Sequence, residues 1–196
     1  MSSRLRFNSA RQVFEAFGSA RDDIATPPTD EPPLAFARRL VNSARPIDGV
    51  AFCAYLLPRR EAVWWGCQCV RALLELQNGG DAALRAAEAW VREPEEETRR
   101  AALELGRVED RRAPTTWLAR AAGWSGGDIA ASGLRPIPAP PHLTAKAVLA
   151  AIVLAGARSD SRWVGWISGC ADGCIRFAEG GDARPRLVGA AAARPG

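Results

Sequence analysis

The stretch from Pro58 to Leu76, PRREAVWWGCQCVRALLEL, constrains the fold more than any other part of the chain. When its residues are placed on a helix at about 100° per residue, the apolar side chains cover well over half of the circumference. That apolar arc is wider than the stripe of a surface helix. The sequence therefore predicts a central and largely buried helix over this stretch.

The rest of this predicted helix is a polar strip that includes one tryptophan. Trp64 falls among Arg60, Gln68 and Arg71, and Arg59 precedes them in the first turn. Either a further helix covers this strip, or Trp64 is partly exposed and contacts another protein. Tryptophan and arginine are the residues that most often carry the binding energy of protein interfaces. We therefore take Arg59, Arg60, Trp64, Gln68 and Arg71 as the candidate protein-binding residues.

Helical periodicity dominates the remaining chain, and no stretch alternates convincingly with period two. The helical patterns over 58–76, 82–93 and 95–108 are separated by short turns, which is typical of antiparallel helix pairs. The sequence therefore predicts an all-α fold, an irregular bundle of seven to eight helices arranged in antiparallel hairpins.

Composition divides the chain into three parts. Residues 1–33 predict a short helix followed by a flexible, proline-rich linker, and residues 34–179 a single helical domain. Residues 180–196 are small, polar and proline-bearing, which is typical of a disordered tail. Inside the domain, the segment 125–141 (SGGDIAASGLRPIPAPP) predicts a long loop, and loops of this length are often functional or mobile.

Charge and hydropathy limit the classes of partner that we expect, which include neither nucleic acid nor membrane. The net charge is +4, from 26 basic and 22 acidic residues that are spread along the chain, so nucleic-acid binding is an unfavoured function. The longest apolar run, 147–157, is too short to cross a bilayer, and the first 17 residues are amphipathic rather than a signal peptide. We expect the cysteines to be free thiols, which is typical of a reducing compartment. We therefore expect a cytoplasmic protein that binds no membrane.

The cysteines and the single histidine are the candidates for chemistry. Cys67 and Cys69 lie about 160° apart on a helix, which is unsuitable for one metal ion. Cys170 and Cys174 share a helical face, but that face is a predicted core stripe. We expect structural thiols, no cofactor and no catalytic residue. An enzyme or metal-binding protein that uses His142 and a nearby thiol is the alternative.

Four segments carry a resemblance to a known group of proteins: PRREAVWWGCQCV, AAEAWVREPEEETRRAA, AAGWSGG and PPHLTAKAV. Over about residues 50–160 the chain resembles an uncharacterised family of all-helical bacterial proteins associated with type VI secretion gene neighbourhoods. The resemblance implies a helical fold and an accessory role in assembling or loading a secretion apparatus. It implies no activity and no catalytic residue. We therefore predict a non-enzymatic accessory or adaptor protein that binds another protein, such as a secretion component or an effector.

Overall fold

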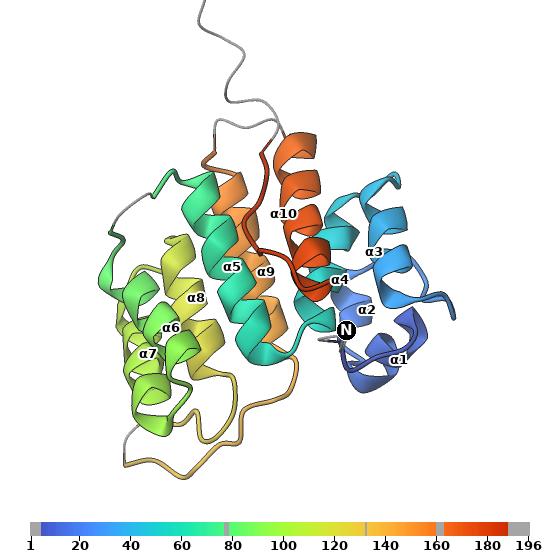
Figure 1. Ribbon diagram of the computed structural model, residues 1–196. Coiled ribbons are helices and arrows are strands. Elements are labelled where there is room, and N and C mark those ends of the chain that lie inside the picture. Colours follow the sequence, from blue (N-terminus) through green and yellow to red (C-terminus); the bar gives the residue numbers. More distant parts are fainter. Residues whose placement is uncertain (1–4, 77–78, 132, 160–162, 188–196) are drawn as a thin grey trace, which may run out of the picture.

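The chain is all-α in the computed structural model, which describes residues 5–76, 79–131, 133–159 and 163–187 (Figure 1). Among these residues the only extended pairing is an isolated antiparallel bridge between Asp128 and Pro138. The described part contains ten helices, where the sequence predicts seven to eight. They are α1 (Ala10–Ala16), α2 (Ala20–Asp23), α3 (Pro33–Val41), α4 (Ile47–Leu56), α5 (Arg59–Leu73), α6 (Ala82–Arg92), α7 (Glu96–Val108), α8 (Pro114–Gly123), α9 (Leu143–Gly156) and α10 (Trp163–Ala178).

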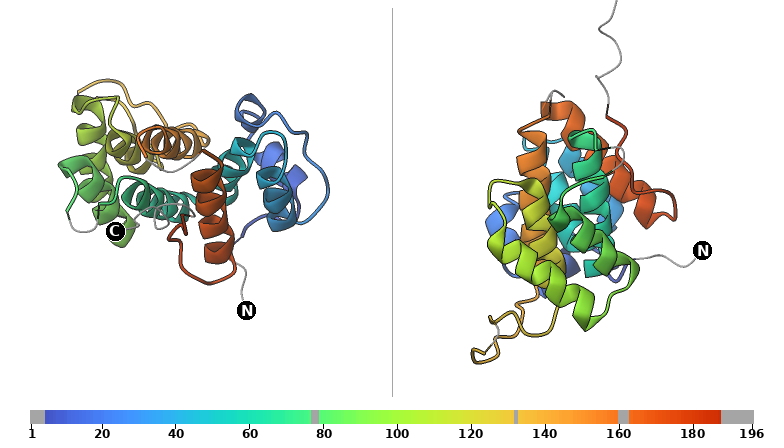
Figure 2. Two further views of the ribbon diagram at one scale, coloured as in Figure 1. Left: turned by 90° about the horizontal axis from the view of Figure 1, so that it is seen from above. Right: turned by 90° about the vertical axis from the view of Figure 1, so that its left-hand side faces the viewer.

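Helix α5 lies in the middle of the molecule, as the width of its apolar arc predicts. Seen from above, α1–α3 and α6–α8 lie at opposite sides, with α5, α9 and α10 between them (Figure 2). The Trp65 side chain is fully buried, and its indole N–H donates a hydrogen bond of 2.9 Å to the carbonyl oxygen of Cys170 in α10. This bond joins two helices that are far apart in the sequence.

The close packing of α5 depends on a missing side chain. A Cβ atom at Gly66 would lie 2.9 Å from the Leu118 side chain of α8 and 3.1 Å from the Val148 side chain of α9. Contacts this short force neighbouring atoms to move, so a larger residue would push the three helices apart.

The N-terminal residues form part of the same core. Phe14, Phe36 and Phe52, from α1, α3 and α4, lie in mutual ring contact and are almost completely buried. The segment 19–33, expected as a linker, contains the four-residue helix α2 and is tied to α4. Its Ala25 and Thr26 amides each donate a 3.1 Å hydrogen bond to the buried carboxylate of Asp48.

The segment that follows α10 also packs on the helices. Residues 182–187, which we call the C-terminal strap, run back between α10 and α5 (Figure 1). Their burial alternates: Ala183 and Pro185 are buried, while Arg184 and Arg186 are exposed. These residues belong to the stretch expected as a disordered tail, and residues 188–196 of that stretch lie outside the described part. No helix among the described residues has the length and apolar character needed to cross a bilayer.

Replacement of Trp65 tests the central position of α5. We expect Trp65→Ala to lower the free energy of unfolding by about 3–5 kcal/mol, because it leaves a large cavity and removes the bond to Cys170. Urea unfolding followed by circular dichroism measures the change. Trp64→Ala, one residue away and half-buried, is the matched control and should cost less than half as much. Equal losses from the two variants would contradict the central role of Trp65.

Candidate protein-binding groove

Four of the five candidate residues, Arg60, Trp64, Gln68 and Arg71, follow one another along the outer face of α5. This face lies between α6 on one side and α10 with the C-terminal strap on the other (Figure 1). Arg60 is exposed, and the other three are half-buried. The outer face is therefore the floor of a groove, which we call the α5 groove.

One end of the groove is a hollow of about 440 Å³ that includes Trp64, here called the Trp64 hollow. Trp64 packs against the core with part of its side chain and leaves the rest open to solvent. Helix α6 contributes Val91 and α10 contributes Phe177, so the hollow has an apolar centre. Its lining residues are Arg60, Glu61, Trp64, Val91, Arg92 and Phe177.

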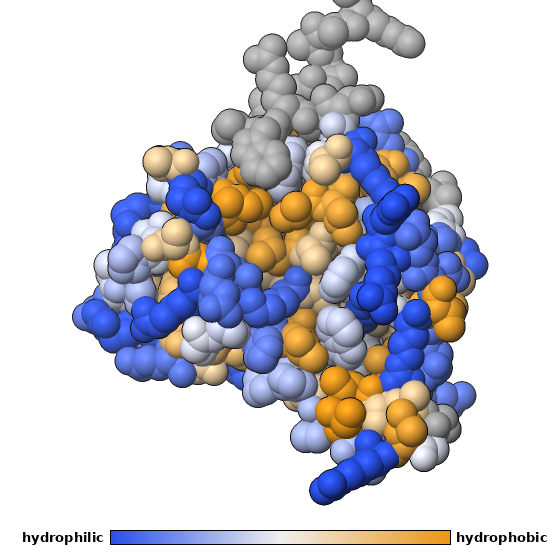
Figure 3. All heavy atoms as spheres, turned by 180° about the vertical axis from the view of Figure 1, so that it is seen from behind, coloured by the Kyte–Doolittle hydropathy of each residue, from blue (hydrophilic) through white to orange (hydrophobic). Residues whose placement is uncertain are grey.

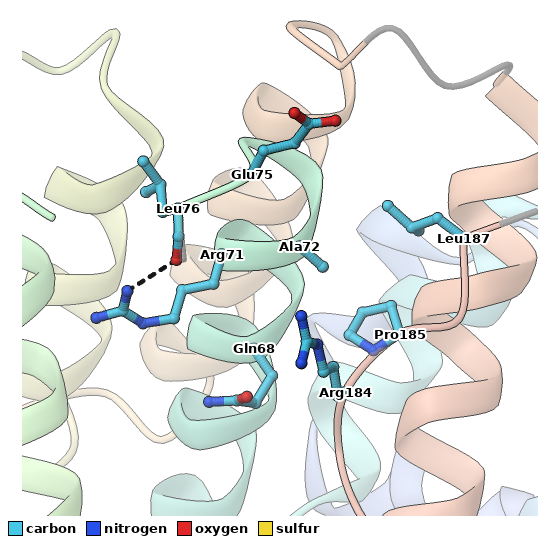
Figure 4. Close-up of a pocket in the computed structure, with 8 residues that line it drawn as sticks. All are labelled: Gln68, Arg71, Ala72, Glu75, Leu76, Arg184, Pro185 and Leu187. Atoms are coloured by element: carbon cyan, nitrogen blue, oxygen red, sulfur yellow. Dashed lines mark hydrogen bonds between the residues drawn. The ribbon is translucent and has the colours of Figure 1, made fainter. Parts of the chain in front are cut away.

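The other end is a hollow of about 530 Å³, here called the Gln68 hollow. Figure 4 shows Gln68 and Ala72 of α5 on one side, with Arg184 and Pro185 of the strap opposite them. The full lining is Gln68, Arg71, Ala72, Glu75, Leu76, Arg184, Pro185 and Leu187. In the described part of the chain, the Gln68 side chain makes no hydrogen bond to another residue.

The arginines at the start of α5 bind the chain itself. Arg59 donates from Nη1 to the carbonyl oxygen of Ser125, at 2.6 Å. Arg60 donates from Nε to the carbonyl of Val91, at 2.6 Å, and from Nη2 to that of Arg92, at 3.2 Å. The last carbonyls of a helix have no partner within the helix, so Arg60 caps the C-terminal end of α6.

Arg71 is bound within the chain as well. Its Nε and Nη2 atoms donate to the two carboxylate oxygens of Glu88 in α6, at 2.5 and 2.8 Å, and this bond to Glu88 raises the pKa of Arg71. The sequence left two interpretations open, a strip covered by a polar helix or a strip that waits for a partner. Arg59, Arg60 and Arg71 fit the first interpretation, and only Trp64 and Gln68 retain surface without a bonded neighbour.

Arginines without an ion pair outnumber the acidic residues along the groove. Arg60, Arg92 and Arg184 are exposed along it, and among the described residues none of the three forms an ion pair. Glu61 and Glu75 are the acidic residues on the same linings. The groove therefore complements an acidic surface.

The described parts of the loop, residues 125–131 and 133–141, have a defined conformation. The Asp128 carboxylate accepts hydrogen bonds from the amides of Ala130, at 2.8 Å, and Ile137, at 2.7 Å. The Ile129 amide donates to the Ile137 carbonyl, at 2.8 Å, so the two halves of the loop lie side by side. The bonds from Ala130 and Ile137, and then the neighbouring Arg100, lower the pKa of Asp128 to about 2.

Helix α7 holds this loop through three arginines. Arg99 is buried and donates to the carbonyls of Gly123, at 2.7 Å, and Asp128, at 3.1 Å. Arg100 donates to the Asp128 carboxylate, at 3.1 Å, and Arg107 donates to the Ile129 carbonyl. The backbone carbonyls of Asp128 and Ile129 are thereby paired without a regular sheet.

The far end of the loop is apolar and exposed. Leu134 is 66% and Ile137 is 52% exposed, which is unusual for large apolar side chains. Seen from behind, apolar side chains gather at the lower end of the molecule, where the loop projects (Figure 3). The loop therefore presents a small apolar surface on a rigid support.

All five cysteines are buried free thiols. Cys69 lies in hydrogen-bonding contact with Cys170, and Cys53 with Cys174, so thiols from α4, α5 and α10 gather in the core. Burial raises the pKa of Cys69 and Cys174, and also that of Cys67. The cysteines are core residues as predicted, but the sequence missed the gathering of four of them.

The alternative function relies on His142 and a nearby thiol. His142 immediately precedes α9, and in the described part of the chain it makes no hydrogen bond to a cysteine. The described residues also contain no group of three or more His, Cys, Asp or Glu side chains arranged to hold a metal ion. Burial raises the pKa of Cys67, Cys69 and Cys174, whereas nucleophilic and metal-binding cysteines have a low pKa.

A pH titration tests the loop. Because the pKa of Asp128 is lowered from 3.8 to about 2 in the folded chain, its bonds are present above pH 3.8 and are lost as the pH falls through 2. We expect the amide proton shifts of Ala130 and Ile137 to titrate together with a midpoint near 2 by NMR. Arg100→Gln should raise this midpoint but leave it below 3.8. A midpoint near 3.8 in the unsubstituted chain would show that the carboxylate is not bound.

A thiol titration tests the burial of the cysteines. We expect none of the five to react with a thiol-specific disulfide reagent in the folded chain, because all are buried. All five should react in denaturant, which is the internal control. Rapid reaction of one or two thiols under native conditions would favour the alternative function, an enzyme or metal-binding protein that uses His142 and a thiol.

The chain can now be compared with known proteins. Residues 36–171, from α3 into α10, match the model of a family of unknown function, DUF6931. No curated protein and no solved structure matches the chain. The match covers α5 and α6 of the α5 groove and the whole loop 125–141, but it ends before the C-terminal strap. The chain therefore belongs to this family of unknown function.

Proposed function

We propose that this protein is a non-enzymatic adaptor that binds another protein in the α5 groove. The observation that carries the proposal is Trp64, which is half-exposed at the floor of a 440 Å³ hollow between α6 and α10. A large aromatic side chain that is partly packed and partly open contributes a large contact area at a small entropic cost.

The groove favours a partner segment that is acidic and amphipathic. Val91 and Phe177 provide apolar walls beside Trp64, so an apolar side chain of the partner fits there. The exposed Arg60, Arg92 and Arg184 attract carboxylates on either side of it. Trp64, Gln68 and Ala72 follow one another at intervals of one helical turn, so the floor of the groove runs along the axis of α5. A straight floor of this kind suits a docked helix.

The loop 125–141 is the second contact in this proposal. Its exposed Ile137 is held through its amide by Asp128, which Arg100 of α7 contacts, and the amide of its exposed Leu134 bonds the Ala131 carbonyl. Binding of a partner therefore costs little conformational entropy in this loop. The setting that the sequence resemblance implies is type VI secretion, with a cytoplasmic secretion component or effector as the partner.

Site-specific photo-crosslinking in living cells tests the groove. A benzophenone amino acid is placed at Trp64 or at Gln68, and at Glu15, an exposed residue of α1, as the control. We expect the same partner protein in the adducts from positions 64 and 68, and not in those from position 15. A type VI secretion protein among the shared adducts would support that setting. Adducts that do not differ between the groove and position 15 would contradict the proposal.

Charge reversal tests the chemistry of the partner. With the crosslinker at Gln68, we expect Arg92→Glu combined with Arg184→Glu to reduce adduct yield at least tenfold, because the groove then repels an acidic segment. The control is Arg112→Glu, a reversal at an exposed arginine outside the groove. Equal yields from both variants would contradict an acidic partner, and circular dichroism checks that both remain folded.

A further inference from the structure

The C-terminal strap lies against a face of α10 that has room only for backbone. A Cβ atom at Gly169 would lie 2.9 Å from the carbonyl oxygen of Arg186, and one at Gly173 would lie 2.8 Å from that of Ala183. Such distances are too short for real Cβ contacts. The two glycines, one turn apart, form a track along which an extended chain lies in direct backbone contact with the helix.

The strap fills this track in the manner of a bound peptide. Its buried residues, Ala183 and Pro185, alternate with exposed arginines, as in an extended chain that faces a surface on one side. Pro185 and Leu187 lie opposite α5 across the Gln68 hollow (Figure 4). The side-chain pattern that the track takes is thus a small residue, proline and an aliphatic residue at every second position.

The connection to the strap is a turn that can open without unfolding α10. Gly180 has a φ of 98°, a left-handed conformation that glycine adopts without strain, and the Gly181 amide donates a 2.8 Å hydrogen bond to the Arg176 carbonyl. The body of α10 is anchored separately, since Cys170 is fully buried and its carbonyl accepts the bond from Trp65. The strap can therefore leave while the helix stays.

The strap leaves one hydrogen-bond donor of α10 without a partner. Arg176 donates from Nη2 to the Arg184 carbonyl, at 2.5 Å, but its Nε is buried without a hydrogen-bond partner. The Asp182 carboxylate is 3.8 Å from Nη2, which is a weak contact. A buried donor left unpaired favours replacement of the strap by a segment that bonds it.

We infer that the track on α10 is an acceptor site for an extended segment of a partner protein, and that the strap is the occupant that this segment displaces. The partner segment has the pattern small–x–Pro–x–aliphatic shown by the strap itself. A strap tethered by two glycines acts at an effective concentration in the millimolar range, so it masks the site until a better segment arrives. The inference concerns the α10 track and does not depend on a partner in the Trp64 hollow.

A peptide-binding experiment tests the acceptor site. The probe is a fluorescein-labelled peptide with the sequence of residues 180–190, and the proteins are the full chain and a chain that ends at Gly181. By fluorescence anisotropy we expect the shortened chain to bind the peptide at least tenfold more tightly than the full chain, because no tethered strap competes. A peptide with Ala183→Trp and Pro185→Asp is the matched control and should not bind either protein.

A second experiment uses the full chain, in case the shortened one does not fold. Trypsin cleaves after Arg186 only when the strap is free, whereas the bond after Arg184 is protected by Pro185. We expect Gly173→Ala to speed this cleavage at least tenfold, because the new Cβ pushes the strap away, and Asp172→Ala, at the adjacent exposed position, to leave it unchanged. The unlabelled peptide with Arg186→Gln, which resists trypsin, should speed cleavage of the unsubstituted chain at millimolar concentration.

The two experiments distinguish an acceptor site for a partner segment from a surface that only the strap itself covers. If the shortened chain keeps its helical circular dichroism and binds no peptide, the acceptor site is refuted. If the shortened chain unfolds, the full chain decides: unchanged cleavage with the competing peptide overturns the inference, and faster cleavage supports it. Crosslinks from position 64 report on the Trp64 hollow, which no strap residue lines, so the two proposals fail independently.

Discussion

The hydrogen bond from the Trp65 indole to the Cys170 carbonyl is the constraint on which the rest of the structure depends. It fixes the side of α5 that faces the core, and with it the side that faces outward. Because Gly66 lets α8 and α9 approach closely on the inner side, α6 and α10 are left as the borders of the outer side. The α5 groove is a consequence of how deeply Trp65 is buried, and Trp64 lies in it because it is the next residue.

The sequence predicts the parts of the fold that repeat with the period of a helix. The central position of α5, the position of its polar strip and the buried thiols all follow from that period. Helix α2 was missed because four residues are too few to show it. The strap was missed because its alternation spans only Ala183 to Leu187 and lies in a stretch whose composition is typical of disorder. The gathering of thiols depends on the packing of α4, α5 and α10, which no local pattern records.

The roles of the arginines were equally hidden from the sequence. Arg59, Arg60 and Arg107 donate hydrogen bonds to backbone carbonyls. Because every residue has a backbone carbonyl, the sequence does not indicate which carbonyl an arginine binds. The planar guanidinium donates in several directions at once, so one side chain can cap a helix or hold a loop. In this chain arginine adds hydrogen bonds to those of the Asp128 carboxylate and the backbone, and together they hold the described parts of the loop without strands.

The burial of the thiols has a consequence for where the folded chain can persist. Thiol exchange requires contact between a thiol and a disulfide, and burial of all five thiols prevents that contact in the folded chain. Once folded, the protein therefore retains the same covalent structure in a reducing and in an oxidising compartment. The adaptor role proposed above is therefore compatible with either kind of compartment.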